Sequence, residues 1–341
     1  MMTEKMISAV SVSYRDEGNI LPLYERLTQT LQKISPNYEI VFVNDASPDR
    51  SEDVLSDLAA KDLRVTVINH SRNFGAQSAF TSGMEQAIGH AVVIMDGDLQ
   101  DPPELIEELV KKWLEGFDVV YGIRRKREAS LGRLHAFLYH IFYLIFRKVA
   151  FIHIPPDAGE FSLMDRKVVD HINALPERSR LIRGLRSWVG FKQTGVAYVR
   201  PERHWGRSTN SFFRNVRWAK QAIFSFSYLP LEYVSHLAGL STLVSLTMIA
   251  IYLFLALFFP APRGFLTLLV VILFLGSIQL LALSFIGEYL QRIFEEVKRR
   301  PKYIVKNILN DHRQGLTDRT VTSTDEYTHQ TPSGRGGDLF R

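Results

Sequence analysis

Residues 91–104, AVVIMDGDLQDPPE, join an apolar run directly to a cluster of acids. The run AVVIM predicts a buried strand. Asp96 and Asp98 follow at once, and Gln100 adds an amide carbonyl. Such hard oxygen donors are the ligands that Mg²⁺ or Mn²⁺ prefers. The two prolines that come next predict the first turn of a helix. The stretch is therefore either a divalent-cation site or a polar loop that happens to be acidic.

Upstream of this junction, strand-like runs alternate with amphipathic segments of helical period. Strands are expected at residues 7–14, 39–44, 65–69 and 91–95, and helices at 20–34, 52–61 and 78–88. This alternation predicts a parallel, doubly wound α/β sheet. Ligands of such sheets bind beyond the carboxyl ends of the strands. Polar clusters follow each expected strand, at Asp16, Asn44-Asp45, Arg72-Asn73 and Asp96/Asp98. This convergence favours the cation site over the polar loop.

A dinucleotide-binding domain is the obvious alternative for such a sheet. The first expected strand is followed by SYRDEGN and not by a G-x-G-x-x-G loop. The sequence also lacks the phosphate-binding pattern G-x-x-x-x-G-K-[ST]. The phosphates of a bound nucleotide would then be neutralised by the cation and not by a glycine-rich cradle.

The composition changes after about residue 230. Residues 237–259 and 264–286 carry no charge over about 23 positions each, which is enough to cross roughly 30 Å of hydrocarbon. The short connection PAPR forces an antiparallel hairpin, and lysines and arginines accumulate on the outer flanks of the two runs. Such an excess of positive charge marks the flanks as cytoplasmic. We therefore expect a two-helix transmembrane hairpin in the inner (plasma) membrane, with the N-terminal domain and both termini in the cytoplasm.

Two segments rich in aromatic and basic residues, 131–152 and 210–230, lie between the expected sheet and the hairpin. They suit helices that lie in the membrane interface, although an ordinary core helix would show a similar pattern. The net charge of +5 is accordingly attributed to anionic lipid headgroups and not to nucleic acid. The expected organisation is a cytosolic catalytic domain (1–230), the hairpin (231–290) and a cytosolic basic segment with a disordered tail (291–341).

Six motifs occur in order along the chain: VSVSYRDEGNI, VFVNDASPDRS, NHSRNFGAQSAFTSGMEQA, VVIMDGDLQDPPELIEELVKKW, DAGEFSLMDRKVV and RPERHWGRST. Together with the paired apolar runs, they resemble family 2 glycosyltransferases with the GT-A fold. Within that family the chain is most similar to polyprenyl-phosphate glycosyltransferases, the group of dolichol-phosphate mannose synthase and the bactoprenol glucosyltransferases. RNFG, DLQDPPE and LPERSRLIRGLRSWVG are most similar to the bactoprenol enzymes.

The resemblance implies a membrane-attached, metal-dependent, inverting glycosyltransferase. Such an enzyme would move glucose from a UDP-sugar to undecaprenyl phosphate at the cytoplasmic face, with mannose, GlcNAc or a modified arabinose as alternative donor sugars. The implied nucleotide-sugar residues are Tyr14, Asp16, Asp45, Arg72 and Asp96, and the implied ligands of Mg²⁺ or Mn²⁺ are Asp96, Asp98 and Gln100. Asp101 and Glu104 are expected to shape the loop and to cap the following helix, whose N-terminus favours acids.

The same resemblance assigns the acceptor side to basic residues and to a further acidic motif. The implied acceptor-phosphate residues are Arg124, Ser130, Arg133, Arg200, Arg203 and Arg207, and the implied catalytic carboxylates are Asp98, Asp157 and Glu160. Bidentate arginine suits phosphate. A phosphate monoester has a second pKa of about 6 and is largely deprotonated at neutral pH. Asp157 and Glu160 would therefore position sugar hydroxyls or arginines more readily than act as bases.

Two other functions compete with this interpretation. A processive polysaccharide synthase would need more membrane spans and usually a Q-x-x-R-W motif, which the sequence lacks. A non-catalytic scaffold or lipid transporter fits poorly, because the apolar runs hold no charge that could bind a substrate within the bilayer. A single hairpin buries little area, and this together with the aromatic segments allows a homo-oligomer.

Overall fold

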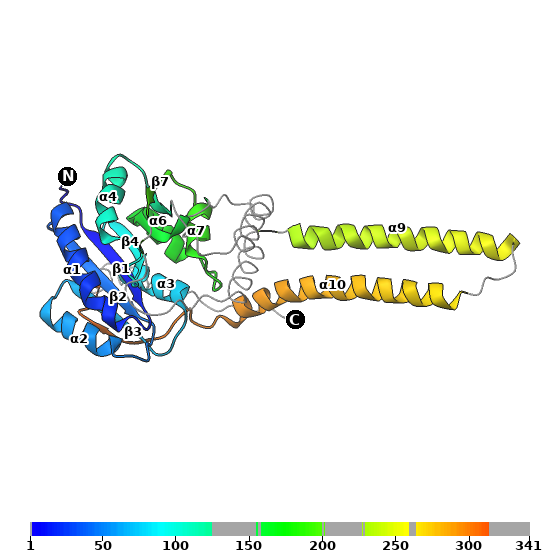
Figure 1. The fold of residues 1–341 in the computed structure, drawn as a ribbon, viewed down its shortest axis with the longest axis horizontal. Coiled ribbons are helices and arrows are strands. Elements are labelled where there is room, and N and C mark those ends of the chain that lie inside the picture. The colour runs from blue at the N-terminus through cyan, green and yellow to red at the C-terminus, as the bar shows by residue number, and fades with distance from the viewer. Residues whose placement is uncertain are drawn as a thin grey trace, which may run out of the picture.

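The computed structural model describes residues 2–124, 155, 158–199, 201, 227, 229–258 and 264–313. This part of the chain forms a mixed sheet with helices on both faces and a long helical hairpin that projects from it (Figure 1). Segment 131–152 and most of 210–230 lie outside the described residues. So do six of the predicted site residues: Ser130, Arg133, Asp157, Arg200, Arg203 and Arg207.

The strands are β1 (Ile7–Ser13), β2 (Tyr38–Asn44), β3 (Val65–His70), β4 (Ala91–Asp96), β5 (Val119–Arg124), β6 (Ala158–Asp165), β7 (Gln193–Tyr198) and β8 (Val305–Leu309). Within the described part of the chain they form one sheet in the order β7-β5-β6-β4-β1-β2-β3-β8. β1 pairs in parallel with β2 and β4, and β2 with β3, which confirms the predicted doubly wound core. β6 runs antiparallel to β4 and β5, and β8 runs antiparallel to β3.

Two hydrophobic layers cover the sheet because successive strand side chains point to opposite faces. On β1, Ile7 and Ala9 pack in one layer, and Val10 and Val12 in the other. The first layer is covered by α1 (Glu17–Ile34), α2 (Ser51–Lys61) and α4 (Ile106–Leu114), and the second by α3 (Ala76–Gln86), α6 (Arg166–Ala174) and α7 (Ile182–Trp188). The short 3-10 turn η1 (Pro103–Leu105) precedes α4, where the two prolines predict a helix start.

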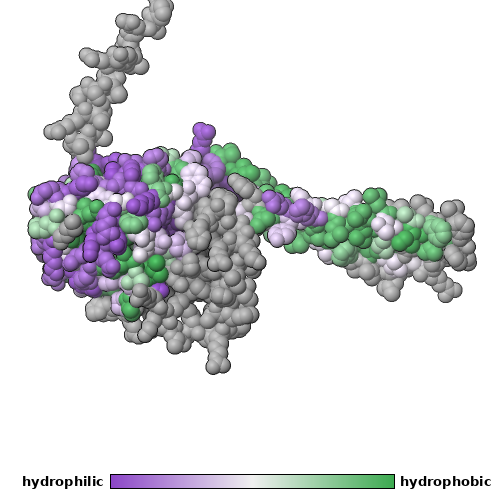
Figure 2. All heavy atoms as spheres, turned by 90° about the horizontal axis from the view of Figure 1, so that it is seen from above, coloured by the Kyte–Doolittle hydropathy of each residue, from purple (hydrophilic) through white to green (hydrophobic). Residues whose placement is uncertain are grey.

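Two long helices, α9 (Leu229–Phe258) and α10 (Phe265–Lys298), occupy the positions of the two predicted spans (Figure 1). They lie side by side and carry exposed apolar side chains, such as Leu243 at 63% and Leu280 at 70%. Figure 2 shows hydrophobic residues along this hairpin and many hydrophilic ones over the sheet domain. Among the helices of the described residues, none combines the length and the apolar character needed for a membrane span.

The chain returns to the sheet after α10, where the sequence analysis expects a basic segment and a tail. β8 lies against β3, with Ile308 paired to Ile68. The side chains of Asn69 and Asn307, which meet across this pair, are 238 residues apart in the sequence. A pairing over this separation leaves no local pattern in the sequence, and this explains why β8 is missing from the predicted strands.

Candidate active site

The carboxyl ends of β1, β2, β3 and β4 lie along one edge of the sheet, because these strands are parallel. The loops that follow them each contain a residue with positive φ: Arg15 (61°), Ala46 (51°), Gly75 (91°) and Leu99 (61°). Only one of these four residues is glycine. The other three loops therefore each hold a non-glycine residue at a positive φ, which such residues rarely adopt. Such strain is concentrated where loops are shaped for a ligand. This edge is the candidate active site, at the position that the sequence predicts.

Asp96 ends β4, and Asp98 follows on a turn that lies against the end of β1. The amide of Gly97 donates to the carbonyl oxygen of Val12 at 3.1 Å, and a Cβ at position 97 would stand 2.5 Å from that oxygen. Glycine is therefore required for the close approach. Asp98 is 4% exposed and accepts a hydrogen bond from the Gln100 amide at 3.1 Å, whereas Asp96 is half-buried. The turn keeps both carboxylates beside the end of β1.

These two carboxylates are the donors that a divalent cation would use. The side-chain Nε2 of Gln100 donates to the Pro201 carbonyl at 3.3 Å, so the amide of this predicted ligand is engaged with another loop. In the described part of the chain, no three His, Asp or Glu side chains cluster closely enough to hold a metal ion. Proteins commonly hold Mg²⁺ by one or two carboxylates together with substrate phosphates and waters. Asp96 and Asp98 fit a cation of that kind.

Arg124, at the end of β5, is held beside this turn by groups from two other elements. Its Nε donates to the Tyr198 hydroxyl at 3.3 Å, and its Nη2 lies 3.8 Å from Oδ1 of Asp101. Tyr198 donates to the same Asp101 oxygen at 2.5 Å. A Cβ on Gly159 would come within 2.7 Å of the guanidinium. The guanidinium is thus fixed in position, although the side chain remains 24% exposed.

The charges around Arg124 keep its guanidinium protonated. Burial lowers its pKa, but the neighbouring Asp101 and Tyr198, and Asp96 at longer range, together raise it above the ordinary value. Burial and Asp101 raise the pKa of the Tyr198 hydroxyl, which therefore stays a neutral donor. This edge of the sheet combines the positively charged guanidinium of Arg124 with the carboxylates of Asp96 and Asp98. It can therefore hold anionic groups and cation-bound groups side by side.

Asp45 is 1% exposed and organises the loop after β3. Its Oδ1 accepts from the Phe74 amide at 2.9 Å and lies 2.8 Å from Nδ1 of His70. Its Oδ2 accepts from the Gly75 amide at 2.7 Å. Arg72 is exposed nearby, with its guanidinium 4.4 Å from the centre of the Phe74 ring. The carboxylate of Asp45 thus shapes the site from inside the protein, and its implied contact with uracil or ribose stays a prediction.

Tyr14 and Asp16 follow β1 at the same edge, and both are half-buried. The Asp16 carboxylate accepts from the Tyr14 amide at 3.4 Å and from Nδ2 of Asn19 at 3.1 Å. Between them, the Arg15 amide donates to Oγ of Ser47 at 2.7 Å. The loop after β1 is therefore tied to the loop after β2.

Glu160 lies near the start of β6, which is at the site edge because β6 is antiparallel to β4. Its Oε1 accepts from Nε2 of Gln77 at 3.2 Å, and its Oε2 accepts from the Arg183 amide at 3.2 Å. Oε1 of Gln77 accepts from the Ile182 amide at 2.7 Å. Glu160 therefore joins β6 to the first turns of α3 and α7.

Nine predicted site residues are found at this edge: Tyr14, Asp16, Asp45, Arg72, Asp96, Asp98, Gln100, Arg124 and Glu160. Gln77 and Tyr198 are not among the predicted residues, because their signal in the sequence is limited to their positions at the ends of elements. The same role was predicted for Asp101 and Glu104. Asp101 belongs to the site, whereas Glu104 forms an ion pair with Arg26 at 2.6 Å.

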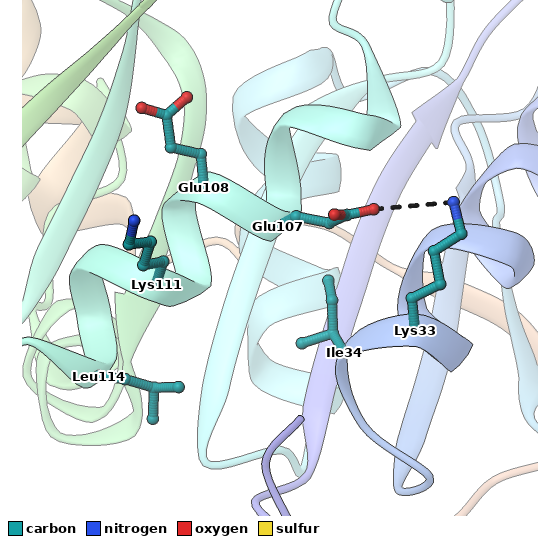
Figure 3. A pocket seen from close by; sticks show the side chains of 6 residues that line it. All are labelled: Lys33, Ile34, Glu107, Glu108, Lys111 and Leu114. Carbon is teal, nitrogen blue, oxygen red and sulfur yellow. Dashed lines mark ion pairs between the residues drawn. The ribbon is translucent and has the colours of Figure 1, made fainter. Parts of the chain in front are cut away.

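A shallow pocket between α1 and α4 is separate from this edge (Figure 3). Lys33 and Glu107 face each other across it at 3.9 Å. None of the predicted site residues that the structure describes lines this pocket.

Comparisons with known proteins find relatives over most of the chain. The model of the family described as Glycosyl transferase family 2 matches residues 8–172. An uncharacterized glycosyltransferase of Synechocystis sp., sll0501, is 42% identical over 304 residues, which are 89% of this chain and 95% of that protein. The bactoprenol glucosyl transferase of Shigella phage SfV is 38% identical over 294 residues, 86% of this chain and 95% of that protein. A solved structure of the mannosyltransferase PcManGT from Pyrobaculum calidifontis, with GDP-Man and Mn2+, is 14% identical with a TM-score of 0.41, covering 86% of this chain and 88% of that one.

Proposed function

The chain belongs to glycosyltransferase family 2, and on that premise we propose that it transfers glucose from UDP-glucose to undecaprenyl phosphate at a membrane surface. The bactoprenol glucosyl transferase at 38% identity supports both the sugar and the class of acceptor. The observation that carries the proposal is the Arg124 guanidinium, fixed by Asp101 and Tyr198 beside the Asp96–Asp98 turn. This arrangement suits a reaction between an anionic acceptor and a diphosphate donor.

In this proposal, the ends of β1 to β4 hold the donor. Tyr14, Asp16, Asp45 and Arg72 form or shape the site for the nucleotide. Asp96 and Asp98 would hold a divalent cation, which when bound neutralises the diphosphate and stabilises the charge of the leaving UDP.

The chemical step is a single displacement. An oxygen of the lipid phosphate attacks C1 of glucose opposite the UDP, the bond from C1 to the diphosphate oxygen breaks, and UDP leaves with the electron pair. The configuration at C1 is inverted. Because the acceptor oxygen is already deprotonated at neutral pH, given a second pKa of about 6, a general base is not required.

Arg124 binds the acceptor phosphate in this scheme, and Glu160 positions α3 and α7 around the sugar. The other residues implied by the resemblance keep their proposed roles. Asp157 would position sugar hydroxyls or arginines, and the acceptor phosphate would be bound by Ser130, Arg133, Arg200, Arg203 and Arg207. Guanidinium groups suit this task because their planar fork matches a phosphate with two parallel hydrogen bonds.

Membrane attachment by the α9–α10 hairpin forms part of the proposal. Its support is the exposed apolar surface on both helices, including Leu243 and Leu280, which lipid would cover (Figure 2). The flanking lysines and arginines favour a cytoplasmic catalytic domain. The anchor would hold the site edge at the level of the lipid phosphate.

A donor screen tests the function. Purified full-length protein in vesicles is given undecaprenyl phosphate, Mg²⁺ and one radiolabelled donor at a time: UDP-glucose, UDP-GlcNAc, GDP-mannose or a UDP-linked arabinose derivative. We expect label in the lipid fraction with UDP-glucose alone. Transfer of another sugar would replace glucose in the proposal, and folded protein that labels the lipid with none of them would overturn it.

A further inference from the structure

The segment that follows α10 runs back to the sheet domain and ends as a strand beside β3 (Figure 1). Residues 299–304 make the connection, and the Ser71 amide donates to the carbonyl of Ile304 at 2.9 Å. From its side chains we infer that β8 completes the donor site: Tyr303 and Asn307 are positioning residues for the loops that follow β1, β2 and β3. The inference rests on the proposed function, which assigns these loops to the nucleotide.

The first connection runs through the ring of Tyr303. This ring stacks on the imidazole of His70, with centroids 5.2 Å apart and planes at 13°. The His70 side chain is 0% exposed and bonds to Oδ1 of Asp45 at 2.8 Å and to Oγ of Ser82 at 2.9 Å. Asp45 in turn holds the loop after β3 through two backbone amides. The Tyr303 ring therefore packs against the His70 imidazole, which in turn holds the Asp45 carboxylate in position.

The second connection is a ladder of side-chain amides across three strands. Oδ1 of Asn307 accepts from Nδ2 of Asn69 at 2.8 Å, and Oδ1 of Asn69 accepts from Nδ2 of Asn44 at 2.9 Å. Oδ1 of Asn44 accepts from the Ser47 amide at 2.9 Å. Ser47 Oγ then accepts from the Arg15 amide at 2.7 Å. In every one of these bonds the group nearer to the β1 loop donates to the group nearer to β8. A change in β8 should therefore alter the loop after β1 through this series of bonds.

Burial makes this ladder sensitive to its last member. Asn44 and Asn69 are each 1% exposed, so an amide that loses its acceptor there has no solvent to replace it. The ladder ends at Arg15 and passes beside Ala46, both at positive φ. Such conformations persist only where surrounding contacts enforce them. Loss of the acceptor at Asn307 should therefore relax the two strained loops.

Five variants of the full-length protein in detergent test this inference. Asn307→Leu removes the acceptor, whereas Asn307→Asp keeps one. Tyr303→Leu removes the stacked ring, whereas Tyr303→Phe keeps it. Lys306→Leu is the control on the same strand, since Lys306 is 54% exposed and pairs with Glu52 at the surface. UDP affinity is measured by calorimetry, amide hydrogen exchange is followed at residues 15, 47 and 75, and circular dichroism establishes folding.

We expect both leucine variants at Asn307 and Tyr303 to bind UDP about 10-fold or more weakly. Asn307→Leu leaves the buried Asn69 amide without its acceptor, and Tyr303→Leu removes the ring that packs on the imidazole holding Asp45. Exchange should accelerate at residues 15 and 47 in Asn307→Leu and at residue 75 in Tyr303→Leu. Asn307→Asp, Tyr303→Phe and the Lys306 control should stay within about 3-fold of the unmodified protein, because each leaves the positioning contact in place.

Unchanged UDP affinity and exchange in folded Asn307→Leu and Tyr303→Leu would overturn the inference. So would Asn307→Asp binding as weakly as Asn307→Leu, because Asp retains the acceptor. If one leucine variant does not fold, the other tests the inference through its own connection. Failure of the unmodified protein to bind UDP would instead overturn the donor assignment of the proposed function, while altered exchange alone would still support the connection from β8.

Discussion

At the scale of single residues, burial and contacts distinguish Asp101 from Asp96. A fully buried carboxylate is stable only where donors or cations compensate it, and Asp101 meets this condition through Tyr198 and Arg124. Asp96 is half-buried at the end of β4 and lies within electrostatic range of Arg124. Asp101 therefore holds Arg124 in position, whereas the turn that carries Asp96 is suited to bind a divalent cation.

Removing the Tyr198 hydroxyl should weaken acceptor use. Hydrogen bonds to charged groups contribute about 1.5–3 kcal/mol, so Tyr198→Phe should lower kcat/KM for the lipid phosphate about 10- to 100-fold. Steady-state kinetics with varied acceptor measures this change, and calorimetry should find UDP affinity unchanged. Tyr38→Phe is the control, since this buried tyrosine bonds to Gln32 at 3.3 Å on α1. If the Tyr198 variant loses UDP affinity and keeps its acceptor kinetics, Arg124 belongs to the donor side.

Removal of the cation, or of the carboxylate that would bind it, should stop transfer. Asp98→Asn lowers the charge of the turn but preserves its size, and we expect a loss of at least about 100-fold in kcat. Excess EDTA should do the same to the unmodified protein, and added Mg²⁺ should restore it. Asp57→Asn, at an exposed position of α2, is the matched control. Full turnover in EDTA would remove the cation from the mechanism.

At the scale of elements, the turn between β4 and η1 depends on the absence of one side chain. Gly97→Ala would set a Cβ 2.5 Å from the backbone oxygen of Val12. A backbone atom cannot move aside as the end of a flexible side chain can. We expect a loss of about 1–3 kcal/mol in unfolding free energy and a lower kcat, because both carboxylates shift with the turn. Gly287→Ala in α10 is the control, since nothing lies within 4 Å of its added Cβ. Denaturant unfolding and transfer rates measure the two effects, and equal behaviour of the two variants would contradict the role of Gly97.

The strands that the sequence predicts well are those buried on both faces. β1 is expected at residues 7–14 and observed at Ile7–Ser13, and β4 is expected at 91–95 and observed at Ala91–Asp96. Central parallel strands read as continuous apolar runs, and such runs are visible without knowledge of their partners. β6 and β8 pair antiparallel with strands far away in the sequence, and their existence depends on those partners.

The candidate site was likewise predictable only where it does not depend on contacts between distant parts of the sequence. The carboxylates at Asp96 and Asp98 were predictable because they directly follow a recognisable strand. The role of Asp101 was not, since its partner Tyr198 is 97 residues away on β7. Two neighbouring acids of one type cannot be told apart until the strand that contacts one of them is known.

At the scale of the whole molecule, the hairpin is an insertion within the sheet domain and not an appendage at its end. The chain leaves that domain before α9 and re-enters it as β8 (Figure 1). The end of α10 also docks on the domain, where Oε1 of Glu296 accepts from the Arg178 amide at 2.8 Å. Beyond it, Nζ of Lys302 donates to the Leu175 carbonyl at 3.2 Å. These contacts fix the sheet domain at one end of the hairpin, whatever environment surrounds the hairpin.

The last prediction concerns that environment. If lipid covers the hairpin, an acid in the middle of α9 should disfavour insertion by roughly 2.5–3.5 kcal/mol, or about 100-fold in partition. Leu243→Asp should therefore weaken flotation with vesicles and lower transfer to undecaprenyl phosphate in them. Transfer to a short-chain, water-soluble polyprenyl phosphate should be unaffected, because the site edge is untouched. Leu63→Asp, at a position 73% exposed on the sheet domain, is the control. If Leu243→Asp floats with vesicles like the unmodified protein, the exposed leucines of the hairpin do not carry the attachment, and the membrane anchor must be sought elsewhere in the chain.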